Sequence, residues 1–189
     1  MSKFFMGLSI LLLVLSGFSC ARGPENASLS DTKTVMKLYD PKKNQSMQDV
    51  DALVMKGKGA VEEMKPFIND KDPKVRWIAV YVIGRVADPQ TAKMLLPLLQ
   101  DEDDVVRISA AGTLANKGVT EALPVLIGGL DSSGSIEYLS PQRTIAEFCL
   151  DVLSTYTKQP LETKQDWQAW WEGNKERVQW DEAEDYYRF

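Results

Sequence analysis

The chain has 189 residues, of which 44% are hydrophobic and 26% charged, a balance that is typical of a folded domain and excludes collagen-like and disordered proteins. It contains no histidine, which excludes Ser-His-Asp and Cys-His catalytic sites and His-Glu-x-x-His zinc sites. With 22 basic and 27 acidic residues the formal net charge is -5, so the sequence predicts no binding to nucleic acid.

The first residues have the pattern of a secretory signal peptide. A single cation, Lys3, precedes an apolar run from Phe4 to Phe18, and small residues follow this run. A permanent transmembrane helix needs about 20 apolar residues, so the run is too short to stay in a bilayer. We therefore expect the protein to be exported.

Two cleavage sites compete at the end of the signal peptide. The segment from Gly17 to Cys20 resembles the lipobox of bacterial lipoproteins. This resemblance implies a lipid on Cys20 and a membrane-anchored protein that faces the periplasm or the cell surface. Cleavage after Ala21 stays open, because Ser19 and Ala21 are both small, and it would release a soluble periplasmic or secreted protein.

The composition of the chain suggests four consecutive parts. They are a signal peptide (1–19), a polar tether (20–30), a repeat region (31–158) and a C-terminal part with a tryptophan-rich cap and an acidic tail (159–189).

The repeat region shows an internal offset of 31 residues. The segment from Asp70 to Arg76 (DKDPKVR) aligns without a gap with the segment from Asp101 to Arg107 (DEDDVVR). In a third, divergent copy Asp131 takes the place of Asp101. A fixed period of this size is typical of solenoids built from stacked helix pairs.

Apolar periodicity and capping residues predict the helices of these pairs. Asp72 and Pro73 form a cap and first position for one helix, and Ser140 and Pro141 do so for another. Residues 132–139 form an inserted loop. In chain order the predicted helices cover residues 47–56, 60–69, 73–87, 90–100, 104–116, 120–130, 141–156 and 164–178.

The motif Asp-Pro-x-Val-Arg, followed by a small-residue pattern on the same helix, is the most specific signal in the chain. Over residues 40–156 the sequence resembles the HEAT-like repeat, also described as the phycobilisome lyase HEAT-like repeat. The resemblance implies an all-α fold, a short right-handed α-solenoid of HEAT-like helical hairpins, which we expect a C-terminal aromatic capping helix to close. Many proteins with such repeats are binding scaffolds.

Four charged residues recur at the same place in the central repeats. Arg76 and Arg107 each follow an inter-helix aspartate, Asp70 and Asp101, by six residues. We interpret them as a structural ladder of Asp-Arg pairs between neighbouring loops. The alternative is that the arginines bind an anionic ligand.

The C-terminal part holds four of the five tryptophans. We expect Trp167, Trp170 and Trp171 to lie along one stripe of a helix and, with Trp180, to cap the last repeat. The alternative is an aromatic platform that contacts sugar or lipid. The acidic tail after Trp180 would keep this end soluble.

A partner surface is expected on the helix predicted for residues 73–87. Trp77, Tyr81 and Arg85 lie four residues apart, away from the core stripe, and these residue types are enriched in binding hot spots. They would otherwise pack against a neighbouring helix layer. The inserted loop at 132–139 is the second candidate surface.

Together these features favour an exported, lipid-anchored, non-enzymatic scaffold, a monomer that binds another protein at the cell envelope. No cofactor or metal site is predicted, and Cys149 is interpreted as a core residue. The alternatives are a bilin-lyase-like enzyme or a chaperone on the same repeats, or glycan binding through the C-terminal tryptophans.

Overall fold

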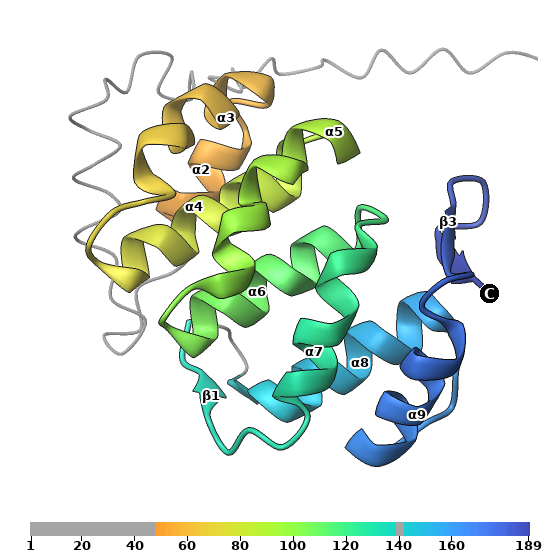
Figure 1. Cartoon of the computed structure of the whole chain (residues 1–189). Coiled ribbons are helices and arrows are strands. Elements are labelled where there is room, and N and C mark those ends of the chain that lie inside the picture. The colour runs from red at the N-terminus through yellow and green to blue at the C-terminus, as the bar shows by residue number, and fades with distance from the viewer. Residues whose placement is uncertain (1–47, 139–141) are drawn as a thin grey trace, which may run out of the picture.

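The structure is a computed structural model that describes residues 48–138 and 142–189, and this part of the chain is mostly helical (Figure 1). The predicted signal peptide (1–19), the tether (20–30) and the lipidation site Cys20 lie outside the described residues.

The helices follow the predicted order. The α-helices and 3-10 helices (η) are α2 (Gln48–Val54), α3 (Lys58–Met64), η2 (Lys65–Phe67), α4 (Pro73–Val86), α5 (Pro89–Ala92), η3 (Lys93–Gln100), α6 (Asp104–Ala115), η4 (Thr120–Ala122), α7 (Leu123–Gly129), α8 (Ile145–Thr157) and α9 (Lys164–Asn174).

Two short antiparallel strand pairs depart from the all-α prediction. Strand β1 (Ser135–Ile136) pairs with β2 (Arg143–Thr144), and β3 (Gln179–Asp181) pairs with β4 (Tyr186–Arg188). The first pair closes the inserted loop and the second folds the C-terminal tail.

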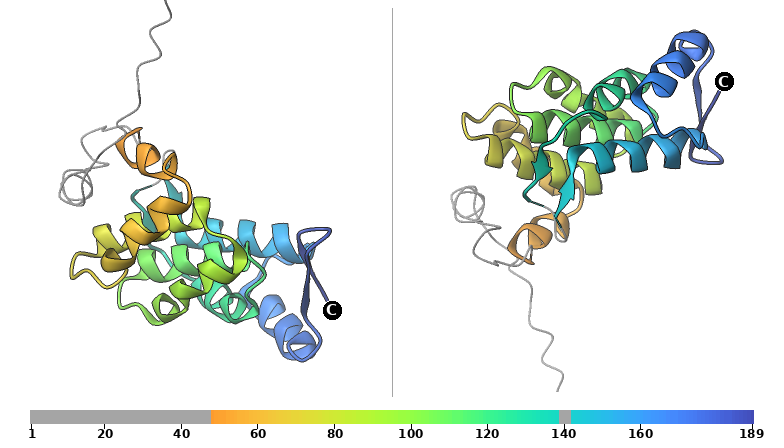
Figure 2. Two further views of the ribbon diagram at one scale, coloured as in Figure 1. Left: turned by 90° about the horizontal axis from the view of Figure 1, so that it is seen from above. Right: turned by 90° about the horizontal axis from the view of Figure 1, so that it is seen from below.

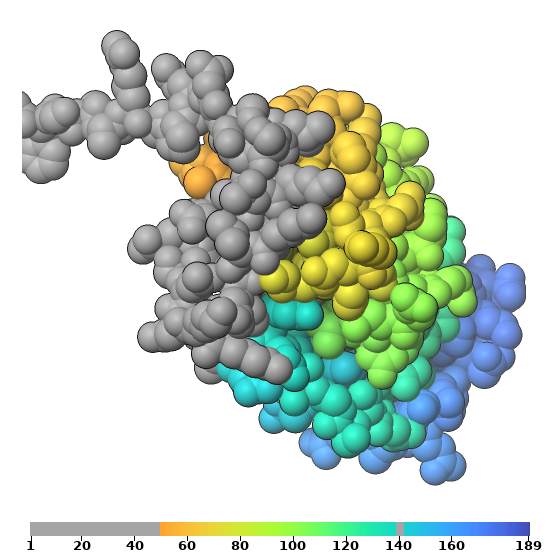
Figure 3. Space-filling model, turned by 90° about the vertical axis from the view of Figure 1, so that its left-hand side faces the viewer, coloured from red at the N-terminus to blue at the C-terminus, as the bar shows by residue number. Residues whose placement is uncertain are grey.

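The central helices form two layers (Figure 2). In one layer α4 packs beside α6, and α6 packs beside α8. The other layer holds α3, η3 and α7, and each of these contacts the helix that follows it in the first layer. Helix α9 packs on α7 at the C-terminal end. Figure 3 shows one face of the molecule, over which the described elements follow one another in chain order.

The starts of α4 and α6 agree with the sequence prediction because their caps are local. The Asp72 carboxylate accepts a hydrogen bond from the backbone N–H of Lys74 (3.0 Å), and Pro73 takes the first helical position. The Asp103 carboxylate accepts from the N–H groups of Val105 and Val106, both at 3.0 Å.

Helix α8 begins later than predicted. A start at residue 141 does not hold, because Arg143 and Thr144 form strand β2 and the helix begins at Ile145. Thr144 and Glu147 form a reciprocal capping box, in which each side chain accepts a hydrogen bond from the other residue's backbone N–H (2.9 and 3.1 Å). The predicted cap at Ser140 and Pro141 lies outside the described residues.

The C-terminal tail is a folded part of the structure, which corrects the expectation of a merely solubilising segment. Tyr187 in β4 is fully buried, and its hydroxyl donates a hydrogen bond to the backbone oxygen of Ala115 at the end of α6 (3.0 Å). Trp180 in β3 lies against Gly118, which has a φ of 77°. The hairpin therefore covers the loop that leaves α6.

No helix in the described part of the chain is both long enough and apolar enough to cross a membrane.

Replacing Gly118 by alanine is expected to lower the free energy of unfolding by about 2 kcal/mol or more. A Cβ atom at this position would lie 2.4 Å from Cγ of Trp180 and would occupy the left-handed region of φ. Gly128 in α7 is the matched control: a Cβ there meets no atom within 4 Å, so Gly128→Ala should stabilise the protein by about 0.5–1 kcal/mol. Urea unfolding followed by circular dichroism measures both, and equal effects would contradict the packing of Trp180 on this glycine.

Candidate functional site

A buried ion pair joins the two central repeats. The guanidinium of Arg76 in α4 binds the Asp101 carboxylate with two hydrogen bonds, from Nε (2.8 Å) and from Nη2 (2.7 Å). Nη1 of the same side chain donates to the backbone oxygen of Asp70 (2.8 Å). The two charged side chains are only 8% and 5% exposed, and the hydrogen bond to Asp101 raises the pKa of Arg76.

The equivalent arginine of the next repeat has no such partner. Nη1 of Arg107 donates to the backbone oxygen of Asp101 (2.6 Å), as Arg76 does to Asp70, and Nη2 pairs with Asp104 three residues earlier in the chain. Asp131, which aligns with Asp101, binds Lys164 of α9 instead (3.0 Å). Within the described residues, the predicted ladder therefore has one cross-repeat rung, Arg76 with Asp101.

A largely apolar groove of about 300 Å³ lies over the layer formed by α4, α6 and α8. All three helices contribute to its walls. The lining residues are Trp77, Val80, Tyr81, Gly84, Arg85, Ser109, Gly112, Thr113, Asn116, Phe148, Val152 and Tyr156. Trp77, Tyr81 and Arg85, the three residues predicted for partner binding, are among them. The sequence predicted only this part of the groove on α4, and the structure shows that α6 and α8 form the rest.

Two glycines let side chains of neighbouring helices approach closely in this groove. A Cβ atom on Gly84 of α4 would lie 2.9 Å from the Thr113 side chain of α6. A Cβ atom on Gly112 of α6 would lie 2.6 Å from the Phe148 ring of α8. The space that a methyl group would fill is therefore occupied by the neighbouring helix at both places.

Trp77 forms the floor of the groove and is not the exposed contact that we expected. It is 2% exposed, and its indole Nε1 donates to the Ser109 hydroxyl (3.1 Å). Its ring lies 5.7 Å from that of Tyr81 and 4.8 Å from that of Tyr138 in the inserted loop. The inserted loop covers the Trp77 side chain. The spacing of residues along one helix cannot predict this contact, because the loop lies much later in the chain.

Tyr81 and Arg85 remain accessible on the groove wall. Tyr81 is half-buried and its hydroxyl donates to the Asp51 carboxylate (3.1 Å); burial and this hydrogen bond raise the pKa of Tyr81. Arg85 is exposed, and its guanidinium lies 5.9 Å from the centre of the Tyr81 ring. Arg85 forms no ion pair with any side chain in residues 48–138 or 142–189.

Residues 61–137, from α3 to β1, match the family model for HEAT repeats. The match supports a HEAT-like repeat protein. Proteins of this repeat type are commonly scaffolds for protein interactions. No significant match exists among curated proteins or among solved structures.

The described part of the inserted loop, the second candidate surface, has its apolar side chains buried or half-buried. Ile136 is fully buried, and Tyr138 is half-buried on Trp77. Leu139 lies outside the described residues. The described part of the loop thus packs against the layer that carries the groove and supports its floor.

The C-terminal tryptophans separate into two clusters, one that joins Trp167 and Trp170 of the predicted helical stripe and one around Trp180. Trp167 is fully buried, its Nε1 donates to the Leu161 oxygen (3.0 Å), and Trp170 lies between it and Phe189. Trp180 belongs to the second cluster, with its ring 6.0 Å from that of Tyr156 and 4.9 Å from that of Tyr187.

Trp171 is half-buried on α9 and packs against the core with Trp170 and Trp180. Tyr187, which sequence reasoning missed, is the most buried residue of the tail. The one sequence feature that could have indicated its burial is the pair of tyrosines, Tyr186 and Tyr187, at the end of an acidic segment.

Cys149 is the one cysteine in the described part of the chain, and its thiol is free. It is fully buried in α8, and burial raises the pKa of its thiol to about 12, so the sulfur is protonated at neutral pH. Among the described residues, no cluster of acidic and cysteine side chains could hold a metal ion.

Proposed function

We propose that this chain is an exported, lipid-anchored and non-enzymatic scaffold that binds another protein at the cell envelope. In this proposal the repeats form a short right-handed α-solenoid and the protein acts as a monomer. The groove over α4, α6 and α8 is the observation that carries the proposal, because it is an accessible and mostly apolar surface on the repeats that match the HEAT family.

The walls of the groove define the kind of segment that it suits. Phe148, Val152 and Tyr156 from α8 line the groove together with Tyr81 of α4. Apolar side chains of a partner would be removed from water there, with a gain of about 25 cal/mol for each Å² of buried apolar surface. Aromatic residues and arginine are also the residue types that dominate binding hot spots.

The charge of the groove adds a second requirement. Arg85 lies in the last turn of α4 and Asn116 is the C-cap residue of α6; both are exposed and line the groove with Tyr156 of α8. A partner segment with an acidic side chain at this end would pair with Arg85, which has no acidic partner in the described structure. We therefore propose an apolar segment with one acidic residue as the ligand.

The lipid anchor rests on the sequence of the signal region. A thioether-linked lipid on Cys20 would hold the repeats beside a membrane, and the polar tether would separate them from it. Release of a soluble protein after cleavage at Ala21 is the alternative. The non-enzymatic part rests on the lack of histidine in the sequence and on the protonated, buried Cys149.

The groove is tested by photo-crosslinking in the cells that make the protein, with benzoylphenylalanine at position 116, which is exposed and lines the groove. We expect a discrete adduct with one partner protein. Arg85→Glu should reduce the yield of that adduct by about tenfold, because it places a like charge opposite the acidic residue of the partner.

Arg177→Glu is the matched control, because Arg177 is also exposed but lies after α9, far from the groove in sequence and not among its lining residues. It should leave the adduct unchanged. An adduct that forms equally well from position 165 on α9, or that is insensitive to Arg85→Glu, would contradict the groove as the binding surface.

The anchor is tested separately by export in cells grown with labelled palmitate. The native chain should carry the label and sediment with membranes, whereas Cys20→Ala should carry none. An unlabelled and freely soluble native chain would reject lipid attachment and leave the ordinary signal peptidase route.

A further inference from the structure

The internal repeat supplies a template for a ligand at Arg107. Arg76 and Arg107 occupy equivalent positions, and each donates from Nη1 to the backbone oxygen of the aspartate six residues earlier. Nε and Nη2 of Arg76 hold the carboxylate of Asp101 from the next repeat. Nε of Arg107 holds nothing within residues 48–138 and 142–189.

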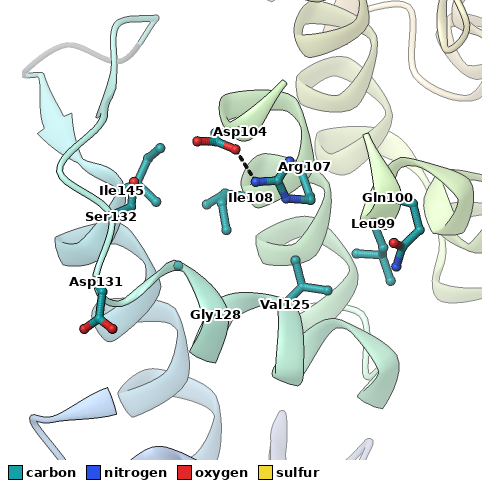
Figure 4. A pocket seen from close by; sticks show the side chains of 11 residues that line it. Leu99, Gln100, Asp104, Arg107, Ile108, Val125, Gly128, Asp131, Ser132 and Ile145 are labelled. Carbon is teal, nitrogen blue, oxygen red and sulfur yellow. Dashed lines mark hydrogen bonds and ion pairs between the residues drawn. The ribbon is translucent and has the colours of Figure 1, made fainter. Parts of the chain in front are cut away.

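The place that a carboxylate would take beside Arg107 is open. A cavity of about 540 Å³ lies at this position, between η3, α6, α7 and the start of α8 (Figure 4). Its apolar lining includes Leu99, Ile108, Val125 and Ile145, and the Arg107 side chain is 30% exposed. The cavity is lined by residues different from those of the groove described above.

The residue that would fill this place by repeat symmetry is held elsewhere. Asp131 aligns with Asp101, but Figure 4 shows it on the far side of the cavity from Arg107. It pairs with Lys164 (3.0 Å), and Lys164 also donates to the backbone oxygen of Gly128 (3.3 Å). In the structure Asp131 therefore lies beside helix α9, and the rung at Arg107 lacks the carboxylate that Asp101 supplies to Arg76.

In the structure Asp104 pairs with Nη2 of Arg107. It stands where the preceding repeat has Pro73, and its side chain is 62% exposed. An exposed pair of this kind contributes little to stability, so the Asp104 side chain can turn to solvent when a better-placed carboxylate binds both Nε and Nη2.

We propose that Arg107 binds the carboxylate of another polypeptide, in the bidentate geometry that Asp101 adopts on Arg76. The ligand is an aspartate or glutamate side chain or a chain terminus, with an apolar side chain beside it that lies against Ile108 and Val125. Asp131 and Asp104 also line the cavity, so the site offers no excess of positive charge and selects its ligand by the planar fork of the guanidinium.

The test uses the full chain labelled with ¹⁵N in its arginine side chains. The Nε–H signal that disappears in Arg107→Lys identifies Arg107. On addition of N-acetylleucine, or of N-acetylleucylaspartic acid amide, whose only carboxylate is on the aspartate side chain, this signal should shift saturably, while the signal of Arg76, whose Nε already binds Asp101, should not move. Tighter binding of the first compound assigns a chain terminus as the ligand, and tighter binding of the second assigns a side chain.

Two variants and one neutral compound control the result. Asp104→Pro, which copies Pro73 of the preceding repeat, should lower the Kd for N-acetylleucine by about threefold, because it removes the competing carboxylate. N-acetylleucinamide, which lacks the carboxylate, should give no saturable shift. The proposal is overturned if Arg107 shifts no more than the exposed Arg85 and Arg177, or if it responds only in Asp131→Asn, which would show that Asp131 fills the rung itself.

Discussion

The buried guanidinium of Arg76 is the interaction on which the register of the two central repeats depends. It binds the side chain of Asp101 and the backbone oxygen of Asp70, so one residue fixes its own loop and the loop of the next repeat. Asp101 also accepts the N–H of Asp103, which in turn caps α6. The pair therefore ties the start of α4 to the start of α6, the two neighbouring helices that carry the groove.

The same arrangement explains why the layer of α4, α6 and α8 can carry a binding surface. Glycines at positions 84 and 112 bring the neighbouring helix close, while Tyr138 from the inserted loop packs on Trp77, which is buried at the floor of the groove. The groove side chains that a ligand could contact include Tyr81, Arg85 and the ring of Phe148. In the proposed role as a scaffold, a preformed groove would reduce the conformational entropy lost on association.

Local signals made much of the fold predictable. Helices α4 and α6 were predicted to within a residue or two because an aspartate cap precedes each and the 31-residue offset repeats it. The rest depends on contacts between distant residues. Tyr187 is buried because its hydroxyl reaches Ala115, 72 residues earlier, and Trp77 is buried because an insertion folds over it. Asp131, which aligns with Asp101, binds Lys164 of the C-terminal helix α9, a contact between distant residues that the repeat pattern does not predict.

The most direct test of the account is a double-mutant cycle on Arg76 and Asp101, measured by urea unfolding of Arg76→Gln, Asp101→Asn and the double variant. Asparagine keeps an oxygen for the Asp103 N–H, so the cycle isolates the cross-repeat pair. The account predicts a coupling of about 2 kcal/mol or more, against less than about 0.5 kcal/mol for the exposed pair of Lys65 and Glu62. A coupling for Arg76 and Asp101 as small as that of the exposed pair would contradict it.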